Sequence, residues 1–163
     1  MEARARSNEL TLLAIMSTVV MLFAAFTSAY LIRRTGADWR QLSLPGIFWF
    51  NTAIVIVSSL TLEITRHSGS RRWLVATCGL GLAFLVGQLL GWNALAAEGI
   101  LLPSNPHSSF IYMLTAVHGA HLAGGIVALL IATARKGPFG LCAAYWHFVG
   151  AVWLYLIIML SVL

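Results

Sequence analysis

Two histidines three residues apart, His118 and His121, are the side chains of this sequence best suited to chemistry. On a helix this spacing places both imidazoles on one face, and imidazole is the commonest protein ligand for metals near neutral pH. Two histidines on one face of one helix cannot both be axial ligands of a single haem. A zinc or copper site would require further ligands, for which His147 and Glu98 are the available groups. We therefore predict structural histidines, each hydrogen-bonded to a neighbouring helix or a water, and no metal or cofactor in this chain.

The few carboxylates give no sign of catalysis. Glu63 stands three residues before Arg66 at the end of an apolar stretch, a spacing that favours an ion pair, with a surface proton-collecting group as the alternative interpretation. Glu98 lies near the end of another apolar stretch and is a second candidate for an ion pair or a surface proton-collecting group. The sequence has no nucleophile–base pair, phosphate-binding loop or carboxylate dyad, and no acidic residue in the middle of an apolar stretch. We predict no catalytic residues, and a self-contained transporter is disfavoured.

The apolar stretches that carry these residues have the length of membrane spans. The chain is 60% hydrophobic and 9% charged, whereas soluble domains are about one quarter charged. A span needs about 20 apolar residues, and backbone groups in lipid must pair within the segment, which makes it a helix. We predict an all-α polytopic membrane protein, a single domain over residues 1–163 with a bundle of five transmembrane helices. The predicted spans are residues 10–32, 47–64, 73–97, 109–134 and 139–163.

The basic residues predict the orientation of the chain. The net charge of +5 comes from short clusters between apolar stretches, a pattern of membrane orientation rather than of nucleic-acid binding. Seven Lys and Arg residues fall on the amino-terminal side and three on the other, so we predict a cytoplasmic amino terminus and an outside carboxyl terminus. The seven are Arg4, Arg6, Arg66, Arg71, Arg72, Arg135 and Lys136, and the three are Arg33, Arg34 and Arg40.

Polar and small residues inside the spans predict contacts between helices. Polar side chains at depth usually face protein or water, and small residues let helices approach closely. We expect the three histidines to link the fourth and fifth spans. The predicted interhelical polar residues are Asn51, Gln88, His118, His121 and His147, and the predicted packing glycines are Gly87, Gly91, Gly119, Gly124 and Gly125.

The last two spans carry motifs of a known family. Tyr-Trp-His-Phe-Val at residues 145–149, followed by Val-Trp-Leu-Tyr-Leu at residues 152–156, resembles the final helix of cytochrome c oxidase subunit III. Residues 110–125, with their His-Gly-Ala-His, are similar to the penultimate helix of that family. The chain resembles the short five-helix form, which lacks the first two of the seven helices of the full-length family. Weaker matches are Ser28-Ala29-Tyr30, residues 49–52, Ser58-Ser59 and Gln88.

The resemblance implies a structural subunit of a haem-copper terminal oxidase of aerobic respiration in the bacterial inner membrane. It implies that haem and copper belong to the catalytic subunit I, against which this chain packs among the other oxidase subunits. It also implies that the chain binds phospholipid and supports proton uptake and the durability of the proton pump. Two departures put proton-related carboxylates in doubt, because Thr18 stands where the family often has Glu and Gly150 where it often has Asp.

Two alternatives stay open from the sequence. A divergent five-helix branch of the family serves nitric oxide reductases, and the missing acids favour an accessory subunit of that complex. A free-standing haem-binding or transport membrane protein is an alternative of another class, and a Soret band in the isolated chain would indicate its haem version. The electron donor, cytochrome c or quinol, is not fixed by the sequence.

Overall fold

The computed structural model describes residues 2–134 and 139–163, and the regular elements among them are all α-helices. These helices are α1 (Glu2–Arg33), α2 (Gly46–Ser68), α3 (Arg71–Ala97), α4 (Pro106–Ala134) and α5 (Phe139–Val162). All five contain a segment that is long and apolar enough to cross a membrane. The predicted all-α fold with five spans is confirmed, and the chain is a multi-pass membrane protein.

The helices extend past the predicted spans at their polar ends. α2 continues from residue 64, the predicted end, to Ser68, and Gly69 then adopts the left-handed conformation with φ 63°. The Gly69 amide donates to the Thr65 carbonyl oxygen at 2.8 Å, a common way to end a helix. The apolar residues of a span end where the helix leaves the lipid. The helix itself continues for some residues beyond that point, because its backbone hydrogen bonds can also form in water. Arg135 and Lys136 of the predicted basic clusters lie outside the described residues.

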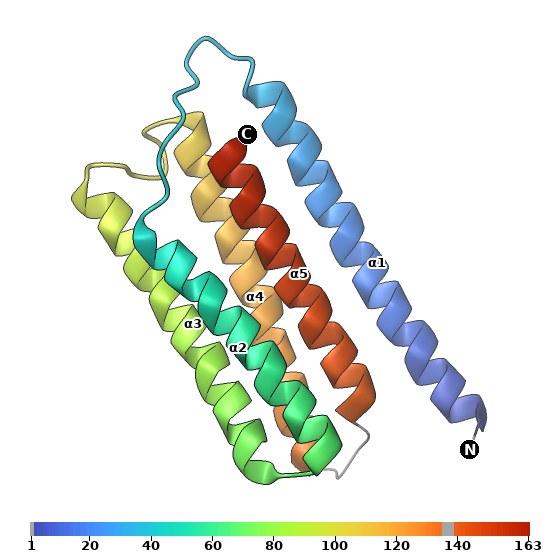
Figure 1. Ribbon diagram of the computed structural model, residues 1–163. Helices are drawn as coiled ribbons and strands as arrows, with labels where there is room; N and C mark the ends of the chain where they lie inside the picture. Colours follow the sequence, from blue (N-terminus) through green and yellow to red (C-terminus); the bar gives the residue numbers. More distant parts are fainter. Residues whose placement is uncertain (1, 135–138) are drawn as a thin grey trace.

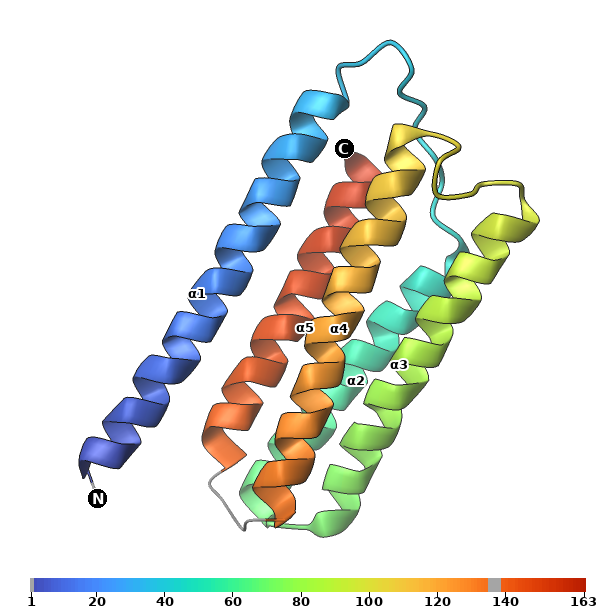
Figure 2. The same cartoon turned by 180° about the vertical axis from the view of Figure 1, so that it is seen from behind.

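Helices α2 to α5 lie side by side as an up-and-down bundle, and α1 stands along one edge of it (Figure 1). The view from behind shows the same separation of α1 from α2 and α3 (Figure 2). α1 contacts α4 and α5, whereas α2 contacts both α3 and α5. The segment after α1 passes over one end of the bundle to reach α2. The four helices α2, α3, α4 and α5 therefore enclose the interior of the protein, and α1 packs on the outer side of α4 and α5.

Two buried tryptophans join α5 to α2. The Trp146 indole N–H donates to the Ser58 hydroxyl at 3.1 Å, and the Trp153 indole N–H donates to the Thr52 hydroxyl at 3.1 Å. Both rings are almost completely buried. Because lipid chains are as apolar as leucine, helices in a membrane gain little from hydrophobic association, and packing and hydrogen bonds hold them together instead. The two tryptophans supply both.

Glycines of α3 bring α2 close. A Cβ atom at Gly91 would lie 2.9 Å from the ring of Phe48, and one at Gly87 would collide with the side-chain amide of Asn51. These distances leave no room for a side chain at either glycine. The backbones of α2 and α3 can therefore come close because these positions of α3 are glycines.

The glycines of α4 have unequal surroundings. A Cβ atom at Gly119 would lie 2.9 Å from the Gln88 amide nitrogen, and one at Gly125 would lie 3.3 Å from the Tyr145 ring. Gly124 is exposed and has nothing within 4 Å of an added Cβ. Among the described residues, Gly124 therefore makes no close helix contact, because it lines an open groove between α1 and the α4–α5 pair.

Candidate functional site

His118 lies in the centre of the bundle. Its ring is fully buried, with its centroid 5.0 Å from that of Trp153 in α5 and 5.6 Å from that of Phe84 in α3. Neither ring nitrogen has a hydrogen-bond partner among the described residues. Of the two predicted partners, a neighbouring helix or a water, no described residue of a neighbouring helix bonds to His118, because aromatic rings surround the imidazole. His118 connects helices through ring packing.

The other two histidines face different helices. The Nδ1 of His121 donates to the Val117 carbonyl oxygen of its own helix at 2.8 Å, and its ring centroid lies 5.9 Å from that of Phe23 in α1. The Nε2 of His147 lies 3.5 Å from a carboxylate oxygen of Glu63 in α2. The expected α4–α5 link through histidine side chains is therefore made by His118, whereas His121 faces α1 and His147 faces α2.

The different directions of these three histidines bear on whether the chain could bind a metal ion. Within residues 2–134 and 139–163, no group of three or more His, Cys, Asp or Glu side chains is placed to hold a metal ion. Residues three apart on a helix differ by about 60° in direction, enough for His118 to point inward while His121 points towards α1. That this chain binds no metal remains a prediction, and the arrangement of the described residues is consistent with it.

Glu63 is the centre of a half-exposed polar cluster at the end of α2. One carboxylate oxygen lies 3.6 Å from a guanidinium nitrogen of Arg66 and 3.5 Å from Nε2 of His147, and the other lies 3.4 Å from Nδ1 of His67. The predicted pairing of Glu63 with Arg66 is thus present, with two imidazoles added. Ion pairs this exposed stabilise a fold by at most about 1 kcal/mol.

Asn51 and Gln88 bond to neighbouring helices. The Asn51 amide donates to the Phe84 carbonyl oxygen of α3 at 3.2 Å, and the Gln88 amide donates to the Thr115 carbonyl oxygen of α4 at 2.9 Å. Both side chains are buried. Each joins a helix to its neighbour at a carbonyl oxygen, as the interhelical interpretation of these residues expects.

In the part of the chain that the structure describes, neither Glu98 nor the two positions where the family often has acids, Thr18 and Gly150, belongs to a cluster like that of Glu63. Glu98 is exposed at the end of α3 and takes part in no ion pair among the described residues. Thr18 is exposed, and its hydroxyl donates to the Ile15 carbonyl oxygen of its own helix. Gly150 is buried, and a Cβ atom there would lie 3.2 Å from Val55 of α2. At these two positions, therefore, the structure places an ordinary helix hydroxyl and a close helix contact where the family often has acids.

An aromatic cluster at the opposite end of the bundle was not predicted. Tyr30 of α1 packs edge-on against Trp39 and Phe110, at centroid distances of 5.0 and 5.3 Å. His107, at the start of α4, is buried beside them, and its Nδ1 accepts a hydrogen bond from the Leu42 amide at 2.9 Å. This cluster fixes the segment after α1 against α4. The sequence signal was weak, because Trp39 resembles an ordinary interfacial tryptophan.

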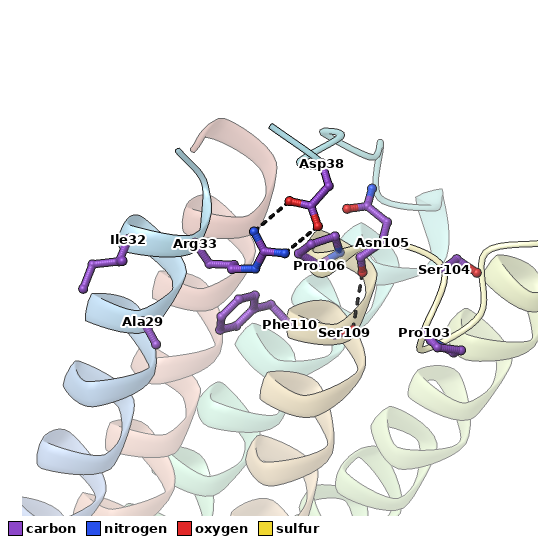
Figure 3. A pocket seen from close by; sticks show the side chains of 10 residues that line it. All are labelled: Ala29, Ile32, Arg33, Asp38, Pro103, Ser104, Asn105, Pro106, Ser109 and Phe110. Atoms are coloured by element: carbon purple, nitrogen blue, oxygen red, sulfur yellow. Dashed lines mark hydrogen bonds and ion pairs between the residues drawn. The ribbon is translucent and has the colours of Figure 1, made fainter. Parts of the chain in front are cut away.

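Beside the cluster, Arg33 and Asp38 form an exposed ion pair, with a guanidinium nitrogen 2.7 Å from a carboxylate oxygen (Figure 3). The hydrogen bond from Arg33 holds the pKa of Asp38 below its usual value. The two residues stand five positions apart, and their pairing closes the turn at the end of α1. In the sequence Arg33 is only one of three basic residues on the side opposite the amino terminus, and the turn gives it a partner.

Comparison with known proteins gives relatives over most of the chain. No family model matches it. It is 30% identical over 162 residues to the probable cytochrome c oxidase subunit 3 of Mycobacterium bovis, covering 85% of this chain and 79% of the relative. It is 30% identical over 168 residues to cytochrome c oxidase subunit 3 of Corynebacterium diphtheriae, covering 88% of this chain and 82% of the relative. A Synechocystis protein of the same name is 30% identical over 168 residues, covering 87% and 70%.

Proposed function

The chain belongs to the cytochrome c oxidase subunit 3 family, and on this basis we propose that it is the non-catalytic subunit III of a haem-copper terminal oxidase. The observation that carries the proposal is 30% identity to a named relative over 85% of the chain. The haem and copper of the complex would lie in the catalytic subunit I, against which one outer face of this chain packs. The absence of a group suited to metal binding among the described residues supports this division of labour.

We propose that the Glu63 cluster faces the cytoplasm and supports proton uptake by the complex. Arg66, Arg71 and Arg72 lie at the same end of the bundle, and Arg33 and Arg40 lie at the other. This distribution supports a cytoplasmic amino terminus in a bacterial inner membrane. The proposal is supported by the geometry of the cluster, in which two imidazoles lie within 3.5 Å of a half-exposed carboxylate at this end of the bundle.

The proton proposal has a matched pair of variants. In the assembled oxidase, Glu63→Gln should lower proton uptake from the cytoplasmic side severalfold at high turnover, since the cluster loses its carboxylate. Glu98→Gln removes an isolated carboxylate at the opposite end and should leave uptake unchanged. Stopped-flow uptake with a pH indicator measures both. Equal rates in the two variants would refute a role for the cluster.

The alternatives lack such support. The relatives carry oxidase names, which favours an oxidase over a nitric oxide reductase. A free-standing haem protein would need axial ligands facing a shared space, and His118, His121 and His147 face three different neighbours. Neither alternative is supported by a specific observation.

The proposed function is tested by mild-detergent purification of the native complex from its host. We expect haem-copper oxidase subunits to copurify with this chain and oxidase haems to dominate the spectrum of the complex. The chain separated from its partners should show no Soret band and no stoichiometric copper. A solitary chain that keeps haem, or a complex whose subunits are those of a nitric oxide reductase, would overturn the proposal.

A further inference from the structure

Two buried polar atoms of the aromatic cluster at the end of α1 have no hydrogen-bond partner among the described residues. They are the Tyr30 hydroxyl and the Nε2 of His107, and both side chains are fully buried. Because the Nδ1 of His107 accepts a hydrogen bond from the Leu42 amide, the imidazole carries its proton on Nε2. Both atoms are therefore donors that need an acceptor, and a buried donor without one is costly.

Two oxygen atoms at the same end of the bundle can accept further hydrogen bonds. The Leu160 carbonyl oxygen lies in the last turn of α5, where carbonyl groups have no partner within the helix. It accepts a hydrogen bond from the Gln41 side-chain amide at 3.3 Å. The Gln41 side-chain oxygen accepts one from the Trp39 indole N–H at 3.3 Å. An amide oxygen has two lone pairs, so each of these oxygens has one left.

The two donors and the two acceptors lie close together without bonding directly. Gln41 lies beside the Tyr30 hydroxyl, and the Leu160 carbonyl group lies beside His107. Neither contact has the geometry of a hydrogen bond. The Tyr30 and His107 rings are themselves neighbours, with centroids 5.9 Å apart. Polar groups that face one another at such a separation are often joined by a water molecule.

We propose that this site binds one water molecule, which accepts hydrogen bonds from the Tyr30 hydroxyl and His107 Nε2 and donates to the Leu160 carbonyl oxygen and the Gln41 side-chain oxygen. Buried waters make typically about three such bonds, so four groups are enough to hold one. The two donors would repel a cation, and the two oxygens would repel an anion. A small neutral ligand that both donates and accepts satisfies all four groups.

The site lies where solvent is near. Gln41 is exposed, and Phe110, whose ring packs edge-on against Tyr30, also lines an open groove of about 830 Å³ at the end of α1. Arg33 and Asp38 line the same groove (Figure 3). The bound water would join α1, the segment after it, α4 and α5 at one point. The inference goes beyond the proposed function and does not depend on it.

Hydroxyl-radical footprinting by X-rays tests the site in the complex purified in mild detergent, because radicals formed from a bound water oxidise the side chains that it touches. Tyr30 and His107 should be oxidised although both are fully buried. Phe48 and Phe84 are equally buried and carry no polar side-chain atom. After correction for the intrinsic reactivity of each residue type, Tyr30 and His107 should react severalfold faster than these two phenylalanines.

A matched pair of variants makes the test specific. Tyr30→Phe keeps the ring and removes one donor, so it should lower the oxidation of His107 severalfold. It should also speed amide exchange in residues 34–42 on the order of fivefold, the effect of losing one hydrogen bond. Tyr155→Phe removes a hydroxyl that bonds to Thr27 outside the site and should leave the oxidation of His107 unchanged.

Two results would overturn the inference. One is oxidation of Tyr30 and His107 in the unaltered complex that is no faster than that of Phe48, and this result does not depend on whether Tyr30→Phe folds. The other is equal oxidation of His107 in Tyr30→Phe and Tyr155→Phe. The oxidase assignment would survive either result, since copurification tests it separately.

Discussion

The α2–α5 bundle and α1 are held by different kinds of contact. Within the bundle, indole N–H groups of α5 bond to hydroxyls of α2, and glycines of α3 bring the backbone of α2 close. α1 buries Val19, Phe23 and Tyr30 against its neighbours. Among the described residues, its one side-chain hydrogen bond to α5 joins the hydroxyls of Thr27 and Tyr155 at 2.7 Å. Long helices of similar hydropathy thus differ greatly in how firmly they attach.

The difference shows what stabilises a helix once it is in lipid. Apolar side chains gain nothing from leaving lipid for protein in the way that they gain from leaving water. Attachment then depends on close packing and on polar groups that find partners. The bundle has both in quantity, whereas α1 depends on a few aromatic contacts and on its connecting segment. Changes in the bundle should therefore unfold the protein, and changes at α1 should loosen one helix.

The largest expected effect is at Trp153. Its ring lies 4.6 Å from that of Phe84 and 5.0 Å from that of His118, and its N–H bonds to Thr52. Trp153→Ala should lower the free energy of unfolding by about 3–5 kcal/mol, measured by titration with denaturing detergent. Trp49→Ala is the matched control, because Trp49 is 51% exposed. Similar losses in the two variants would show that the bundle interior is no more demanding than its surface.

A second test adds a side chain rather than removing one. Gly91→Leu should lower the free energy of unfolding by about 1–3 kcal/mol, since the new side chain meets the buried Phe48 ring. Gly124→Leu should change it by no more than about 0.5 kcal/mol, because nothing lies within 4 Å of an added Cβ there. The same detergent titration compares them. If both variants kept full stability, close approach of α2 and α3 would not be what holds the bundle.

Hydropathy was enough to predict five helices, because each must satisfy its backbone within the lipid. It could not predict that α1 stands apart, since a span facing lipid and a span facing protein are equally apolar. The helix that each histidine faces could not be predicted from the sequence for a related reason. A spacing of three residues puts His118 and His121 on roughly one face, but the helices that meet that face decide whether each finds an aromatic ring or α1.

The groove at the end of α1 was hidden for another reason. It depends on a turn that brings Asp38 back to Arg33 and on Asn105 bonding to the backbone of Arg40, 65 residues away. No periodic pattern encodes such contacts. The Glu63–Arg66 pair, in contrast, was predictable because both residues lie on one helix, while the approach of His147 required the packing of α5 on α2.

A third test measures the attachment of α1. Tyr155→Phe removes the hydroxyl contact with Thr27 and should lower the stability of α1 by about 0.6 kcal/mol, the average for such bonds in membranes. The expected signal is faster hydrogen exchange in α1, with exchange in α2–α5 unchanged. Thr18→Val is the control, because the Thr18 hydroxyl bonds only within α1. Faster exchange throughout the bundle would show that α1 is an integral part of the bundle.

The smallest expected effect concerns the segment that follows α1. The hydrogen bond from Arg33 lowers the pKa of Asp38 from its ordinary value of 3.8. A lowered pKa means that the ion pair contributes its full stabilisation above that ordinary value, and that this contribution is lost as the pH falls towards the lowered one. The rate of amide exchange in residues 34–42, corrected for its intrinsic pH dependence, should therefore increase as the pH falls from about 5 to about 3. Asp38→Asn should show no such increase, since an amide does not titrate.

The tryptophan and glycine contacts that hold α2 to α3 and α5 contain no titrating group, so exchange there should stay constant over the same range. An increase of equal size in the bundle would mean that acid acts on the whole fold, and the separation between a rigid bundle and a tethered α1 would fail.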